Sequence, residues 1–272
     1  AYYDRYNLMD LRILSNFGLN SNDIIAIKNT EGVDGVFATM SMPVTTIKDT
    51  YEYVLIAHGI DIKNTNSDNK NYINQYALIE GRYPLRSGEC LIEDLQLFQS
   101  NLNLGDTITL ESGTDKDILS SLVVDTYKIV GIVKTPYYLS YQKGTTNIKD
   151  GRIDAFIVIP NSDFISDYYH EIFVTIDGGK AYNSYQSSYF DHIETVVDQL
   201  GVIGNIQSEK RYNEIIDEAN KKLDEAKLEY QNGLTTYETE IEKAERELEE
   251  ARFELIRGQI ELANNQLLLA IT

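Results

Sequence analysis

The chain has 272 residues, of which 42% are apolar and 25% charged, and its formal net charge is −19. This composition excludes wholesale disorder. The acidity argues against nucleic acid as a partner, because affinity for nucleic acid comes from Lys and Arg that neutralise phosphates, and equally against binding of the body of the chain to an anionic membrane surface.

Alternating apolar residues predict a strand over residues 8–15. The next stretch, NSNDIIAIKNT, offers an Asn or Ser N-cap to a short amphipathic helix, and β-rich runs follow at 35–47 and 51–60. Residues 61–73 form a predicted loop rich in Asn, Asp and Lys. This loop lacks the Gly and the closing Glu of an EF-hand, so a solvated loop is favoured over a calcium site.

A second unit is predicted from residue 74 onward. ALIEGRYPLRSGECLIE is a turn between apolar segments, and LQLFQSNLNLGDTITLES predicts a short helix, a Gly-Asp turn and an alternating strand. The strand that contains YKIVGIVKTP places Gly131 at a bulge or at a close backbone approach.

Two strands, IDAFIVIP and YYHEIFVTID, come next, and they are followed by a helical pattern that we expect to end at Gly201. This strand–helix order repeats that of the N-terminal part. The sequence therefore predicts one α+β unit made from both ends of the core, with a β-rich unit inserted between them. The apolar positions of the helical pattern are Tyr189, Ile193, Val196 and Leu200.

From about Glu209 the composition changes: Glu, Lys, Ala and Leu dominate and Pro is absent, which predicts a long helix. Apolar or small residues recur in alternating steps of three and four, which is typical of a helix that buries one seam against a partner. Two successive steps of four, from Gly233 to Ile241, make a stutter that unwinds the supercoil locally. The seam comprises Ile216, Ala219, Leu223, Ala226, Tyr230, Gly233, Tyr237, Ile241, Ala244, Leu248, Ala251, Leu255, Gly258 and Leu262.

Such an arm would be roughly 95 Å long at about 1.5 Å per residue. A solvated charged single helix is the alternative, but the regular seam argues for a partner helix. The chain begins without Met and its last residues continue the helical pattern, so we expect a segment of a longer protein. The partner would then be a helix further along the parent chain, the arm of another copy, or a crystal neighbour.

No residue pattern points to catalysis. His58, His170 and His192 stand far apart and have no Cys, Asp or Glu at metal-ligand spacing, and DGGK at 177–180 fits a strand-end turn rather than a phosphate loop. Cys90 is alone, which excludes an internal disulfide, and we expect it to be a small buried hydrophobe. We therefore predict no enzyme, no cofactor and no metal.

Several stretches, taken in order, resemble a known family. DLRILSNFGLNSNDIIAIKNTEGVDGV, LIEGRYPLRSGECLIED, LNLGDTITL, YKIVGIVKTPYYLS and IDAFIVIPNSDF are similar to successive motifs of the MacB-like periplasmic core domain of FtsX-like ABC transporter permeases. Each motif is weak alone, but their common order is fairly specific. The likeness covers most of residues 8–205.

The arm departs from the Gram-negative efflux pumps of that family. AKLEYQNGLTTYETEIEKAERELEEA instead resembles its Firmicute branch, in which helical coiled-coil arms are inserted into the extracellular domain. Because of this departure, the resemblance does not support a periplasmic adaptor or an outer-membrane protein as a partner of this chain.

The resemblance implies a split core at 1–208, with a porter-like part at 1–60 and 152–208 and a sabre-like insert at 74–151. Residues 209–272 would be a coiled-coil arm, truncated in this chain. It also implies flanking transmembrane helices, a separate cytoplasmic ATPase, and a place on the extracellular face of the cell membrane. The domain would transmit force from ATP hydrolysis or handle a peptide or lipid-type substrate, without catalysis.

Two other classes of function stay open at this point. One is a surface interaction or scaffold protein, and the other is a coiled-coil activator of a cell-wall hydrolase. Hydrophobic spans beside this segment and a neighbouring ATPase would favour the permease, whereas a wall anchor would favour the scaffold.

Overall fold

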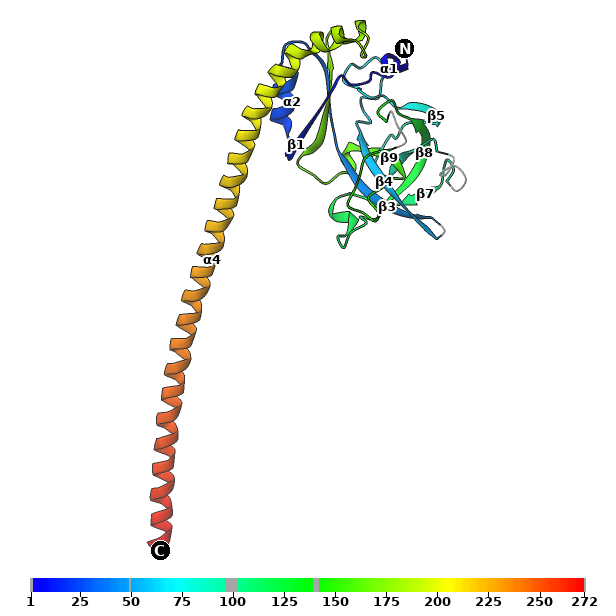
Figure 1. The fold of residues 1–272 in the computed structure, drawn as a ribbon. Helices are drawn as coiled ribbons and strands as arrows, with labels where there is room; N and C mark the ends of the chain where they lie inside the picture. Colours follow the sequence, from blue (N-terminus) through cyan, green and yellow to red (C-terminus); the bar gives the residue numbers. More distant parts are fainter. Residues whose placement is uncertain (1, 49, 96–101, 139–141, 272) are drawn as a thin grey trace. The chain divides into compact units, whose positions relative to one another are not determined.

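Two β-sheets and one long helix make up the fold, which is α+β (Figure 1). The structure is a computed structural model and describes residues 2–48, 50–95, 102–138 and 142–271. It opens with the short helix α1 (Tyr2–Arg5). The 3₁₀ turns are η1 (Ile118–Ser120), η2 (Asn161–Asp163) and η3 (Gly179–Ala181).

The smaller sheet is antiparallel and has the order β1 (Leu11–Leu19), β10 (Tyr169–Ile176), β2 (Val33–Thr39). The helix α2 (Ser21–Lys28) follows β1, and Asn20 is its N-cap, which confirms the Asn alternative of the prediction; Asp23 completes a reciprocal capping box that was not predicted. The first turns of the helix α4 (Ser187–Ile271) also pack on this sheet. The small-sheet core that results consists of Leu19, Ile27, Val36, Ile172, Val174, Ile176, Tyr189, Ile193, Val196 and Leu200.

The larger sheet is mixed and has the order β3 (Ser41–Lys48), β4 (Tyr51–Ile60), β9 (Ala155–Pro160), β6 (Glu89–Glu93), β8 (Thr126–Lys134), β5 (Ala77–Gly81), with β7 (Thr107–Thr109) beside β8. Its central strands are apolar on both faces. Cys90 and Ile92 belong to one core cluster, whereas Leu91 between them belongs to another. Because successive side chains of a strand point to opposite faces, this sheet is covered on both sides. Cys90 is fully buried, which confirms the expectation for it.

Gly131 lies at a register shift between β6 and β8, where Leu91 pairs with Gly131 and skips Val130. A Cβ at Gly131 would also approach the carbonyl oxygen of Arg82 and the side chain of Leu91 too closely. Both halves of the prediction for this glycine are therefore confirmed: it sits beside a bulge, and the neighbouring backbone comes close.

The expected end of a helix at Gly201 is wrong. Gly201 lies inside α4, which continues as one helix of 85 residues to Ile271. A glycine inside a helix costs only about 1 kcal/mol relative to Ala, and good helix formers on both sides outweigh that cost. The short helix expected at the start of LQLFQSN falls mostly on 96–101, outside the described residues.

The pairing of strands joins segments predicted as porter-like to the segment predicted as the insert. The strands β3, β4 and β9, which lie within 1–60 and 152–208, belong to the larger sheet together with the strands of 74–151. The parallel pairing of β4 with β9 joins them across the intervening insert. Only β1, β2 and β10 form the smaller sheet.

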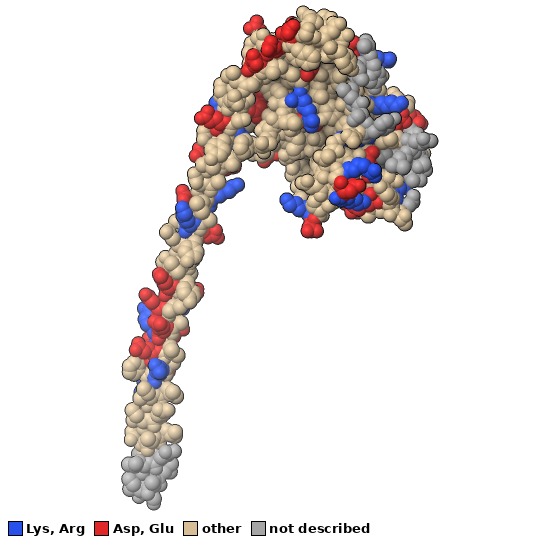
Figure 2. All heavy atoms as spheres, viewed as in Figure 1, with Lys and Arg blue, Asp and Glu red and all other residues tan. Residues whose placement is uncertain are grey.

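The chain divides into two compact units, residues 1–210 and 211–272. The second unit is the continuation of α4, and its described side chains from 212 to 265 are almost all exposed, with acidic and basic groups on its surface (Figure 2). No helix among the described residues is long and apolar enough to cross a membrane.

We expect residues 1–210 to fold without the rest of α4. The small-sheet core takes its helical residues from Tyr189 to Leu200, so the truncated chain keeps every buried apolar contact of the two sheets. It should melt in one cooperative transition, monitored by near-ultraviolet circular dichroism of its tyrosines. An insoluble or molten product would show that residues beyond 210 are part of the core.

Candidate functional site

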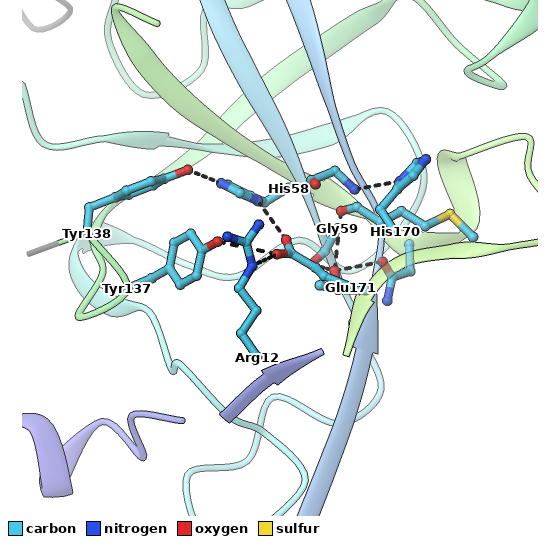
Figure 3. A network of polar contacts seen from close by, with 11 residues as sticks. Arg12, His58, Gly59, Tyr137, Tyr138, His170 and Glu171 are labelled. Carbon is cyan, nitrogen blue, oxygen red and sulfur yellow. Dashed lines mark hydrogen bonds and ion pairs between the residues drawn. The ribbon is translucent and has the colours of Figure 1, made fainter. Parts of the chain in front are cut away.

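A buried carboxylate marks the junction of the two sheets. Glu171 lies on β10 of the smaller sheet and is only 1% exposed. Its Oε2 accepts a hydrogen bond of 2.7 Å from Nε of Arg12 on the neighbouring strand β1, and one of 3.3 Å from the hydroxyl of Tyr137 (Figure 3). The Arg12 guanidinium also lies 5.7 Å from the centroid of the Tyr137 ring. This carboxylate is therefore held by one cation and one hydroxyl.

His58 approaches the same carboxylate from β4 of the larger sheet. Its Nδ1 lies 3.9 Å from Oε1 of Glu171, and its Nε2 shares a hydrogen bond of 2.5 Å with the hydroxyl of Tyr138. Burial, together with the nearby charge of Arg12, lowers the pKa of His58 to about 3. The imidazole is therefore neutral at physiological pH, and the contact with Glu171 is not an ion pair. Oε1 of Glu171 has no hydrogen-bond partner in the described part of the chain.

The order Tyr138, His58, Glu171 has the connectivity of a hydroxyl–imidazole–carboxylate relay. Burial raises the pKa of Tyr138 far above its usual value, so its hydroxyl stays protonated, and the low pKa of His58 makes the imidazole a weak base. The arrangement joins the two sheets through hydrogen bonds.

A cavity of about 470 Å³ opens beside this network and shares lining residues with a larger one of about 870 Å³. Lys143, which lines both, pairs with Oε1 of Glu93 at 3.1 Å. Burial raises the pKa of Glu93 more than Lys143 lowers it. The charged side chains that line the smaller cavity belong to two pairs, Arg12 with Glu171 and Lys143 with Glu93. Among the described residues no three His, Cys, Asp or Glu side chains come together in a way that could hold a metal ion.

A second set of polar contacts joins the sheets at the turn between β2 and β3. The backbone N–H of Ser41 donates to Nδ1 of His170 at 3.0 Å, and the Thr39 hydroxyl donates to the carbonyl of Gly59 at 2.9 Å. A Cβ at Gly59 would collide with the side-chain amide of Asn161. Burial lowers the pKa of His170, although Glu171 opposes the shift. The side chains of His58 and His170 are therefore both neutral near pH 7.

These pKa values predict that the protein loses stability as the pH falls from 7 to 5. In the unfolded chain His58 binds a proton below about pH 6.5, whereas in the folded chain it does so only near pH 3. Its stabilising contribution is complete above about pH 6.5 and is lost as the pH falls. Over this window the loss is about 2 kcal/mol.

Urea denaturation at a series of pH values measures this slope. The variant His58→Gln should reduce this slope, because Gln does not titrate, and the slope that remains includes the contribution of His170, whose pKa is also lowered. The pKa values of Glu52 and Glu89 are lowered, so protonation of these groups changes the stability only below about pH 4.5, outside the range from pH 7 to 5. Equal slopes in the protein and in His58→Gln would contradict the account.

The residues of the predicted seam all lie on α4 and share one face of it. The exposed fractions of its large residues run from 40% at Ile241 to 71% at Tyr230, and Leu248, Leu255 and Leu262 are at least 60% exposed. The structure thus contains the predicted helix, whereas the pairing of this helix with a second one stays a prediction. All seam residues are exposed, among them Ile216, Leu223, Tyr230, Tyr237, Ile241, Ala244, Leu248, Ala251, Leu255, Gly258 and Leu262.

Sequence reasoning missed the junction. His58 and His170 were treated as far apart, whereas the fold places Glu171 beside both. The available signal was a charged residue inside the apolar strand YYHEIFVTI, with a second one, Arg12, inside LRILS. Buried charges inside strands require partners, but a sequence does not tell which strands are neighbours.

Comparison with known proteins finds no matching family model and no matching curated protein. Among solved structures, the chain is similar to the extracellular domain of the noncanonic ABC-type transporter YknZ from Gram-positive bacteria, at 12% identity and a TM-score of 0.44, over 72% of this chain and 87% of that one. It is also similar to the periplasmic region of MacB from Actinobacillus actinomycetemcomitans, at 11% identity and a TM-score of 0.38, over 70% and 76% of the two chains.

Proposed function

We propose that this chain is the non-catalytic extracellular domain of an ABC transporter permease. In this role it transmits movement driven by ATP hydrolysis in a cytoplasmic subunit, or handles a peptide or lipid-type substrate outside the membrane. Its partners are the flanking transmembrane helices of the same permease, the ATPase and a second helix along α4. The ordered motifs of residues 8–205 support this assignment.

One observation carries the mechanical part of the proposal: a single helix belongs to the core and continues beyond it. Tyr189, Ile193, Val196 and Leu200 of α4 are buried in the small-sheet core, and the same helix continues without a break to Ile271. Asp10 ties its start to the sheet, because one carboxylate oxygen accepts from the Tyr189 hydroxyl at 2.6 Å and the other from the backbone N–H of Ile176 at 2.7 Å. A displacement of β10 would therefore move the buried first turns of α4, residues 189–200, which we call the root of α4.

The same proposal assigns the two sheets to the two parts of such a domain. The smaller sheet with α2 and α4 corresponds to the porter-like part, and the insert at 74–151 to the sabre-like part. The strands β3, β4 and β9 would then be shared with the insert. The Glu171 network lies at this boundary, where hydrogen bonds and one ion pair join the two sheets.

The seam of α4 requires a second helix in this proposal. Burying one Leu side chain contributes roughly 1.5 to 3 kcal/mol, so several seam residues together outweigh a modest cost of association. A helix further along the parent chain, running antiparallel, would cover the seam; the arm of another copy is the alternative.

Cysteine labelling on intact cells tests the location. Cys90 is fully buried and burial raises the pKa of its thiol, so it provides almost no background. Glu250→Cys in the full-length protein adds an exposed thiol away from the seam. A membrane-impermeant maleimide should label this variant on intact cells. Labelling only after lysis would contradict an extracellular location.

A copurification experiment tests the transporter class. The full-length protein, extracted from membranes in mild detergent, should bring an ATPase subunit with it. Extraction only with the cell wall, without any ATPase, would contradict the permease assignment and favour a scaffold.

A further inference from the structure

We propose that the seam of α4 binds a helix of different sequence that carries Lys or Arg at every seventh position along one flank, rather than the α4 of a second copy. This inference rests on the proposed function, and it deepens it by naming the chemistry of the partner helix. The observation behind it is a row of glutamates beside the seam.

The row lies on one flank of the distal seam. Each of its members comes one residue before a large seam residue, so all of them repeat at seven-residue intervals on the same side of the helix. In a coiled coil such flanking positions face the partner helix and decide its identity and direction. The row consists of Glu240, Glu247, Glu254 and Glu261, which precede Ile241, Leu248, Leu255 and Leu262.

These glutamates are available to a partner. All of them are exposed, and Glu247 has a single contact of 3.8 Å with the exposed side chain of Lys243. Glu240, Glu254 and Glu261 form no ion pair within the part of the chain that the structure describes. Their charges are therefore not neutralised by α4 itself.

The other flank of the seam is mixed. Its corresponding positions are Glu245, Arg252 and Gln259. The two flanks of α4 therefore differ in charge, which makes the row a directional feature rather than a general acidity of the helix.

Antiparallel pairing of two copies would be unfavourable. Two antiparallel helices of the same sequence place the same flank of each against the other, so the glutamates of the row would face the glutamates of the second copy. Like charges at such positions repel, and they do so most strongly at low ionic strength.

Parallel pairing of two copies offers little compensation, because it sets each flank against the opposite flank of the other copy. Glu247 would then meet Arg252 favourably, but Glu240 would meet Glu245, and Glu254 would meet the uncharged Gln259. Neither direction therefore favours a second copy as the occupant.

The small residues of the seam indicate which apolar residues the partner helix should carry. Ala244, Ala251 and Gly258 alternate with the large residues, and small residues allow two helix axes to approach closely. The partner should therefore bring large apolar residues opposite these positions and basic residues opposite the row.

A charge-reversed copy of this chain is the probe. The variant Glu240→Lys, Glu247→Lys, Glu254→Lys and Glu261→Lys keeps the seam and turns the acidic row into a basic one. Mixed with the unmodified chain, it should form a one-to-one complex in analytical ultracentrifugation. At about 0.05 M salt this complex should be about tenfold or more tighter than the self-association of either chain. The difference should shrink at about 0.5 M salt.

A matched variant separates the row from net charge. Glu225→Lys, Glu242→Lys, Glu249→Lys and Glu250→Lys make the same change of charge on faces turned away from the seam. This control should not pair preferentially with the unmodified chain. Equal pairing by the two variants, or an unmodified chain that dimerises as tightly as the mixture, would overturn the proposal. Neither result depends on the labelling of intact cells, which tests the proposed function separately.

Discussion

Replacing Arg12 with Leu should destabilise residues 1–210 by about 3 kcal/mol. Breaking a buried ion pair by removing one partner typically costs about 3 to 5 kcal/mol, because a charge is left buried without compensation. Glu171 is 1% exposed and would keep only the hydroxyl of Tyr137 at hydrogen-bond distance. We place the effect at the lower end because the Arg12 side chain itself is 42% exposed.

Urea denaturation followed by near-ultraviolet circular dichroism measures this loss. The double variant Arg12→Leu, Glu171→Leu should recover most of it, since apolar residues often replace a buried ion pair at little cost. Lys70→Ala is the control, because its pair with Asp34 is exposed on both sides and contributes at most about 1 kcal/mol. If Arg12→Leu is no more destabilising than Lys70→Ala, the junction is not held by this pair.

The second large effect should come from the root of α4. Ile193→Ala together with Leu200→Ala removes two side chains that are 7% and 8% exposed in the small-sheet core. Each change of this kind costs about 2 to 5 kcal/mol, through lost burial and the cavity that remains. The double variant should therefore unfold the smaller sheet at a much lower urea concentration.

The same helix supplies a matched control for this prediction. Leu248→Ala together with Leu255→Ala makes similar changes at residues that are 63% exposed. In the isolated chain these changes should leave the unfolding of residues 1–210 within about 0.5 kcal/mol of the original. If both double variants destabilise the core alike, then α4 is not divided into a buried root and an exposed continuation.

Local patterns were sufficient to predict most individual elements. The N-cap at Asn20, the bulge at Gly131 and the buried stripe of Tyr189, Ile193, Val196 and Leu200 depend on neighbours within a few residues, and all of them are confirmed. The end of the helix at Gly201 was wrong because a single glycine is a weak stop signal when helix formers follow it.

Strand order and the junction depend on contacts between distant residues. The parallel pairing of β4 with β9 brings Leu55 beside Ala155, across about a hundred residues of intervening chain, and no periodicity signals it. For the same reason Glu171, Arg12 and His58 were not grouped in advance. The seam differs, because all its residues lie on one helix and its spacing can be counted directly.

In the proposed function movement reaches α4 through the core, and double electron–electron resonance in the proposed membrane-embedded transporter tests this most directly. Spin labels at Lys116→Cys in the core and Glu250→Cys on α4 occupy exposed positions, and buried Cys90 stays unlabelled. We predict that the distance distribution between the labels changes when the ATPase goes from the nucleotide-free to the ATP-bound state. The distribution between labels at Lys63→Cys and Lys116→Cys, both in the first unit, should change less. Identical distributions for the Lys116–Glu250 pair in both nucleotide states would contradict the account.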